Sequence, residues 1–131
     1  MTFEQFKLWA DMHDQITDYA YDFFDTIRKE YPSLLVDKPS NCYYDGIEIS
    51  DHSARLLIKY TISGEDHCIF KLSSDNIKRF LASPVFAARE YAKEQLAIQE
   101  REKTAKLLEQ QFTEREKEIA EFNRIKEKYN L

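Results

Sequence analysis

The C-terminal part of the chain constrains the fold most, because it contains nothing that would interrupt a helix. From residue 85 to about residue 129 there is no Gly and no Pro, and most residues are Ala, Glu, Lys, Leu, Gln or Arg, which favour helix. Ser83 and Pro84 precede this run and suit an N-cap and a first helical position. At 1.5 Å per residue the helix would span roughly 65–70 Å. A small domain cannot bury that length, so we expect a protruding C-terminal helix.

The apolar residues of this helix repeat every seven positions, as in a coiled coil. Arg101 and Arg115 occupy two positions of the same repeat, so the pattern is imperfect. It is compatible with a modest coiled coil, a bent antiparallel pairing, or docking on a partner. We expect the chain to form a homo-oligomer through a seam made of Ile98, Ala105, Leu108, Phe112, Ile119, Phe122 and Tyr129.

Residues 2–31 predict an amphipathic helix. Thr2 and Gln5 have the spacing of a capping box. At 100° per residue, one side collects Phe6, Trp9, His13, Ile16, Ala20, Phe23, Phe24, Ile27 and Tyr31. We expect this side to be buried. His13 lies within it and is therefore predicted to be a buried, hydrogen-bonded structural histidine rather than a catalytic one.

Five aspartates lie on nearly the opposite side of this first helix: Asp11, Asp14, Asp18, Asp22 and Asp25. The simplest interpretation is the solvated face of an amphipathic helix. A second is a docking surface for a basic partner, including mimicry of nucleic acid. A metal site is disfavoured, because a calcium loop needs a Gly turn and a dense series of ligands, and this segment has neither.

Three β-strands are predicted at 42–50, 54–62 and 67–73, where apolar and polar residues alternate between short polar linkers. They would form an antiparallel meander with one face on the core, covered by the first helix. A short helix is predicted over 73–83. The fold class is therefore α+β, with a core domain at 1–84 and a long charged helix at 85–131.

The outer face of this sheet is the clearest candidate binding surface. Cationic, apolar and aromatic side chains would project together there, namely Arg55, Lys59, His67, Lys71, Leu57, Ile69 and Tyr44. Such a patch suits a small anionic ligand or an acidic partner. The alternatives are an ordinary sheet exterior, or a face covered by the long helix with its acidic residues.

Charge and cysteine content exclude several classes of protein. The net charge is −5, which argues against direct nucleic-acid binding through phosphates. Residues 85–131 carry equal numbers of basic and acidic residues, so the whole net charge belongs to residues 1–84. Cys42 and Cys68 do not form a disulfide framework or a zinc spacing. Because no signal peptide or membrane-spanning run is present, we expect a cytoplasmic protein with free thiols and no membrane association.

No residue pattern predicts catalysis. His52 lies in the turn "SDHS" beside Asp51, where a histidine is usually solvated. Cys42, His67 and Cys68 would need a bulge to share a metal, because residues 67 and 68 of a strand point to opposite faces. The two glycines provide no phosphate-binding loop. We therefore expect no enzyme activity, no metal and no cofactor.

The order of elements, with "FKLSSDNI" leading into a long helix that ends "NRIKEKYNL", resembles small tailed-phage accessory proteins of unknown function. The resemblance covers residues 42–131 and is one of pattern. It implies an accessory protein that binds or blocks a host protein or defence component. The alternatives are a sponge that sequesters a small nucleotide-like anion, and a structural or assembly accessory protein.

Overall fold

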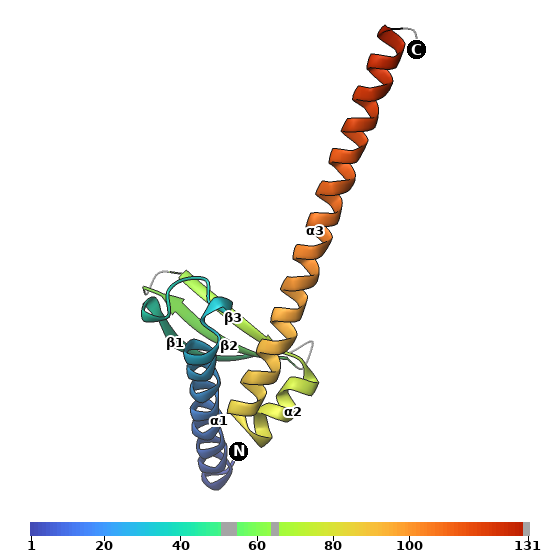
Figure 1. Ribbon diagram of the computed structural model, residues 1–131. Helices are drawn as coiled ribbons and strands as arrows, with labels where there is room; N and C mark the ends of the chain where they lie inside the picture. The colour runs from blue at the N-terminus through green and yellow to red at the C-terminus, as the bar shows by residue number, and fades with distance from the viewer. Residues whose placement is uncertain (51–54, 64–65, 130–131) are drawn as a thin grey trace. The chain divides into compact units, whose positions relative to one another are not determined.

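The computed structural model describes residues 1–50, 55–63 and 66–129. Helix α1 (Phe3–Glu30) is followed by two single-turn 3₁₀ helices, η1 (Pro32–Leu34) and η2 (Pro39–Asn41). Strands β1 (Cys42–Ser50), β2 (Arg55–Ile62) and β3 (Asp66–Leu72) come next, and then helices α2 (Ser74–Ala82) and α3 (Pro84–Lys128) (Figure 1). The predicted α+β arrangement is confirmed. Within the described residues no helix combines the length and apolar content needed to cross a bilayer.

Local sequence signals set the starts of two helices. The Gln5 N–H donates to Thr2 Oγ1 at 3.1 Å, and the Thr2 N–H donates to Gln5 Oε1 at 2.9 Å. This reciprocal pair is the predicted capping box at the start of α1. At the start of α3, the Phe86 N–H donates to Ser83 Oγ at 3.3 Å. Ser83 therefore caps a helix whose first residue is Pro84, as the sequence predicts.

The sheet is an antiparallel meander in the order β1-β2-β3. Ile58 of β2 lies opposite Ile47 on one side and opposite Phe70 on the other. A β-bulge interrupts β1 between Tyr44 and Gly46, where Gly46 has a φ of +103°. The extra residue changes the alternation, so that Tyr44 and Ile47 both pack against the core.

One face of the sheet and parts of all three helices enclose a single core. In strands β2 and β3 the buried residues are Leu56, Ile58, Tyr60, Phe70 and Leu72. The helices contribute Ala20, Phe23, Phe24, Ile27, Phe80, Ala87, Ala88, Tyr91 and Ala92. The aromatic rings contact one another directly, with centroids 4.9 Å apart for Tyr60–Phe70 and 5.5 Å apart for Phe23–Tyr91. The alanines allow the backbone of α3 to approach the core closely.

The chain divides into an N-terminal unit, Met1–Gln95, and a C-terminal unit, Leu96–Leu131. The boundary lies after Gln95 rather than after residue 84, where the sequence placed it. The reason is that the first turns of α3 are buried, with Ala87, Ala88 and Ala92 at 0% exposure. Helix propensity is the same on both sides of this boundary, so only packing reveals it.

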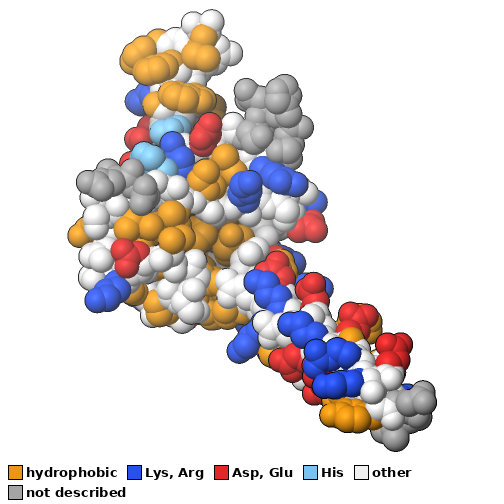
Figure 2. Space-filling view, turned by 90° about the horizontal axis from the view of Figure 1, so that it is seen from above, with side chains coloured by type: hydrophobic (Ala, Val, Ile, Leu, Met, Phe, Trp, Pro, Cys, Tyr) orange, Lys and Arg blue, Asp and Glu red, His pale blue; other side chains and the backbone are white. Residues whose placement is uncertain are grey.

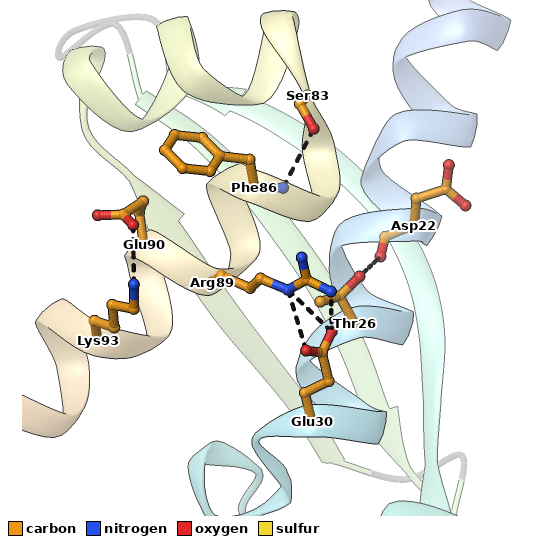
Figure 3. A network of polar contacts seen from close by, with 8 residues as sticks. All are labelled: Asp22, Thr26, Glu30, Ser83, Phe86, Arg89, Glu90 and Lys93. Atoms are coloured by element: carbon orange, nitrogen blue, oxygen red, sulfur yellow. Dashed lines mark hydrogen bonds and ion pairs between the residues drawn. The ribbon is translucent and has the colours of Figure 1, made fainter.

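Polar contacts hold the start of α3 within the N-terminal unit, and Figure 3 shows the one between Arg89 and Glu30. Arg89 donates from Nε and Nη2 to both carboxylate oxygens of Glu30 on α1, at 3.1 and 3.2 Å. Glu94 accepts from Asn76 and Arg79 of α2, at 3.1 and 2.9 Å. These bonds tie α3 to α1 and α2, so these charged residues have a structural role.

The apolar side of α1 is buried only along its second half. Phe6 and Trp9 are 51% and 54% exposed, and His13 is also exposed and stacks on Trp9 at 5.3 Å. The prediction of a buried His13 is therefore wrong. A helix of 28 residues is about 42 Å long, which exceeds the roughly 15–25 Å over which a small three-stranded sheet can cover it.

Candidate interaction surfaces

The C-terminal unit presents the predicted seam to solvent. Every residue from 97 to 129 is exposed. Two aromatic members of the seam are largely accessible, with Phe112 at 64% and Phe122 at 66% exposure. Because this unit is one uninterrupted helix as far as Lys128, the seven-residue spacing of the seam is preserved along that helix. In Figure 2 separate hydrophobic side chains stand among the Lys, Arg, Asp and Glu side chains of this helix.

The outer sheet face brings together most of the predicted binding residues. The register pairs Leu57 with Lys71 and Lys59 with Ile69, and Arg55 and His67 follow on the same face by alternation. Tyr44 is not among them, which corrects the prediction. The bulge turns it toward the core, where it packs edge-on against Tyr21 with ring centroids 5.9 Å apart.

Acidic residues accompany the cations on this outer face. His67 Nδ1 lies 3.1 Å from a carboxylate oxygen of Asp45. Glu48 lies directly opposite Leu57 in the register. The negative charges of Asp45 and Glu48 therefore offset part of the field of Arg55, Lys59 and Lys71. The face is a mixed polar and apolar surface, and its attraction for an anion is weaker than the sequence pattern predicts.

The aspartate face of α1 consists of two parts. Asp11, Asp14, Asp18 and Asp22 are exposed and form no ion pair with another described residue. Asp25 instead pairs with Arg28 at 2.7 Å and with Lys29 at 2.8 Å. The hydrogen bond from Lys29 is the main cause that lowers the pKa of Asp25. Within the described part of the chain, no three His, Cys, Asp or Glu side chains are grouped as a metal site would require.

An apolar groove in the N-terminal unit was not predicted from the sequence. It has a volume of about 440 Å³, which lies within the range of small-molecule pockets. Its walls come from α1, the sheet and α2: Ile16, Ile49, Leu56, Ile77, Phe80 and Leu81, with Arg55, Ser74 and Lys78 beside them. The i, i+3 and i+4 spacing of Ile77, Phe80 and Leu81 is the sequence signal that could have indicated it.

The cysteines do not form a reactive site. Cys42 is fully buried and its thiol donates to the Asp37 carbonyl, with sulfur and oxygen 3.8 Å apart. Burial raises the pKa of the Cys42 thiol, the opposite of what a nucleophilic cysteine needs. Cys68 packs against the core, whereas His67 is exposed on the outer face. Asp51 and His52, which the sequence places in a turn, lie outside the described residues.

Comparison with known proteins adds no functional information. No protein-family profile, no curated protein and no solved structure matches this chain. The candidate interaction surfaces of this chain are the C-terminal seam, the outer sheet face, the aspartate face and the apolar groove.

Proposed function

We propose that this chain is a non-catalytic interaction protein that self-associates through its C-terminal helix and binds a partner protein through its N-terminal unit. One observation carries the proposal. The seam from Ile98 to Tyr129 combines apolar side chains at heptad spacing with exposure of every member, along a single helix that ends at Lys128. Burying one Phe or Ile side chain contributes roughly 1.5–3 kcal/mol. A row of them along an isolated helix therefore favours association with another helix.

The partner is best sought among proteins of a host cell. The pattern resemblance to small tailed-phage accessory proteins supports a role in binding or inhibiting a host protein or defence component in the host cytoplasm. The exposed Phe6 and Trp9 of α1, the apolar groove and the aspartate face supply a surface for recognition. An assembly role without a host target would use the same C-terminal seam.

Self-association is tested on the full chain by light scattering after size exclusion. We expect the unmodified protein to be an oligomer and the double variant Phe112→Glu, Phe122→Glu to be a monomer. Leu107→Glu is the matched control. Leu107 is also apolar and 50% exposed on the same helix, but it lies outside the heptad positions, so its substitution should leave the oligomer intact. An unmodified protein that is monomeric at all concentrations would refute the proposal.

A second candidate function is sequestration of a small nucleotide-like anion on the outer sheet face. What favours it is the shared orientation of Arg55, Lys59 and Lys71 in the register. A ligand that binds only the folded state raises its thermal stability. A thermal shift with cyclic or linear nucleotides that is lost in Lys59→Glu, Lys71→Glu would support this function. The absence of a shift with every nucleotide would exclude it.

A further inference from the structure

We infer that the partner of the C-terminal helix is a second copy of this chain, and that the two helices run antiparallel with their two-fold axis between Thr113 and Glu114. This inference rests on the proposed self-association and specifies its geometry. It follows from the charged residues that interrupt the seam and from the sizes of the residues that would face one another. The relevant helix is continuous to Lys128, and the residues from 97 to 129 are exposed.

A parallel pair places identical charges against each other. In a parallel, in-register coiled coil each seam residue faces its own counterpart in the second copy. Lys126 lies at a seam position by the seven-residue count from Ile98, and Arg101 and Arg115 lie at the complementary seam position by the count from Leu108. Three core layers would therefore contain two cations each, without an acidic residue at the seam to compensate. Like charges held together in a partly dehydrated seam are destabilising.

An antiparallel pair gives a better match of both size and charge. Only one antiparallel register overlaps the whole seam from Ile98 to Tyr129. It places small Ala105 opposite bulky Phe122, and Leu108 opposite Ile119, whereas a parallel pair would place Ala105 opposite Ala105 and Phe122 opposite Phe122. The antiparallel layers are therefore more even in volume, which favours close packing. Ile98 then faces Tyr129 at each end.

Near the two-fold axis of this register, Arg115 makes a favourable contact although it interrupts the apolar seam. Arg115 of each copy faces Phe112 of the other, on both sides of the two-fold axis. A guanidinium over an aromatic face is attracted by the ring quadrupole. The side chain of Phe112 is 64% exposed in the single chain and is therefore free to receive it. Arg115 can thus occupy a seam position without facing another cation.

One unfavourable pairing remains in the antiparallel register, in two symmetry-related layers compared with three in the parallel pair, and it provides the test. It places Arg101 opposite Lys126, twice in each dimer. Neither residue has a charged side chain three or four positions away in the described helix, so reversing its charge leaves helical ion pairs unchanged. In the antiparallel dimer, Arg101→Glu or Lys126→Glu alone changes two repulsive pairs into attractive ones. The double variant restores repulsion.

The experiment measures the dimer dissociation constant of full-length chains by sedimentation over a concentration series. We expect each single variant to bind about tenfold more tightly than the unmodified chain, and the double variant to return near the unmodified value. Lys103→Glu, at an outward position, controls for the change in net charge. Single variants that associate no more tightly than this control would overturn the antiparallel register but leave self-association standing. A monomeric unmodified chain would overturn both.

A covalent test of the antiparallel register applies if the dissociation constant of the unmodified dimer is too low to measure. Full-length Ala105→Cys and Phe122→Cys chains are mixed in a glutathione redox buffer, and the intact masses of the disulfide-linked products are determined. The antiparallel register predicts mainly the mixed product, because residue 105 of one copy faces residue 122 of the other. Dimers linked mainly between identical chains, or a mixed product below the statistical share, would overturn it. Peptide masses of the linked products are used to check whether the native Cys42 and Cys68 take part in the disulfides.

Discussion

Ala88 provides a direct test of the finding that the first turns of α3 belong to the core. Ala88 is 0% exposed, on a helix whose residues from 97 onward are exposed. Ala88→Leu adds three carbon atoms at a position that is fully enclosed within the core cluster. Overpacking of this kind costs about 1–3 kcal/mol. If residues 84–95 were instead part of a free helix, the same substitution would be nearly neutral, because Ala and Leu have similar helix propensities.

Ala97→Leu is the matched control, because Ala97 lies on the same helix and is exposed. Its substitution should change the free energy of unfolding by less than about 0.5 kcal/mol. Both variants are unfolded with urea and followed by near-UV circular dichroism, which reports packing of the aromatic core and not the helix content of the C-terminal unit. A stability of Ala88→Leu within about 0.5 kcal/mol of the control would refute the boundary at Gln95.

Four further predictions test individual contacts in the N-terminal unit. The buried hydroxyl of Tyr44 has no hydrogen-bond partner among the described residues. Tyr44→Phe should therefore leave the free energy of unfolding in urea unchanged or raise it by about 1 kcal/mol. A decrease of more than about 1 kcal/mol would mean that the hydroxyl is hydrogen-bonded. Because Cys42 is buried with a raised thiol pKa, a thiol reagent should modify Cys68 first in the native protein and Cys42 only slowly, whereas simultaneous reaction of both would contradict this packing. Burial raises the pKa of Tyr91 to about 12; because the unfolded chain ionises its tyrosines near pH 10, the stability that Tyr91 contributes should be present below pH 10 and be lost as the pH rises toward 12. Tyr91→Phe should shrink this alkaline loss in urea titrations, and an unchanged pH profile would argue against it. The Arg89–Glu30 pair is about half exposed, so Arg89→Ala should cost no more than about 1 kcal/mol, and a larger loss of thermal stability would indicate a buried role for this pair.

Much of the fold could be predicted because its signals are local. The capping residues Thr2 and Ser83 act on backbone groups within three residues of themselves. Strands β2 and β3 follow from alternation over a few residues, which directly encodes a half-buried sheet. The long helix follows from helix propensity and the lack of Gly and Pro. None of these signals depends on what lies on the far side of the core.

The candidate surfaces were predicted less well, because exposure depends on residues distant in sequence. The shared face of Arg55, Lys59 and Lys71 followed from alternation within strands. Tyr44 was assigned to the wrong face because a single bulge at Gly46 changes the alternation, and Gly46 alone does not identify a bulge. The apolar groove combines residues from α1, the sheet and α2, which only the tertiary arrangement brings together.

The sequence by itself determined the type and order of the elements, the amphipathic character of α1 and the heptad spacing of the C-terminal seam, because these are periodic properties of neighbouring residues. Only the tertiary structure decided which part of each amphipathic surface is covered. The stripe of α1 is buried from Ala20 to Ile27 but exposed at Phe6 and Trp9. Likewise, α3 is buried at Ala88 and exposed at Phe112. The physical reason is that a periodic pattern specifies which side of a helix is apolar, whereas burial requires an opposing surface, and the small sheet supplies it over only part of each helix.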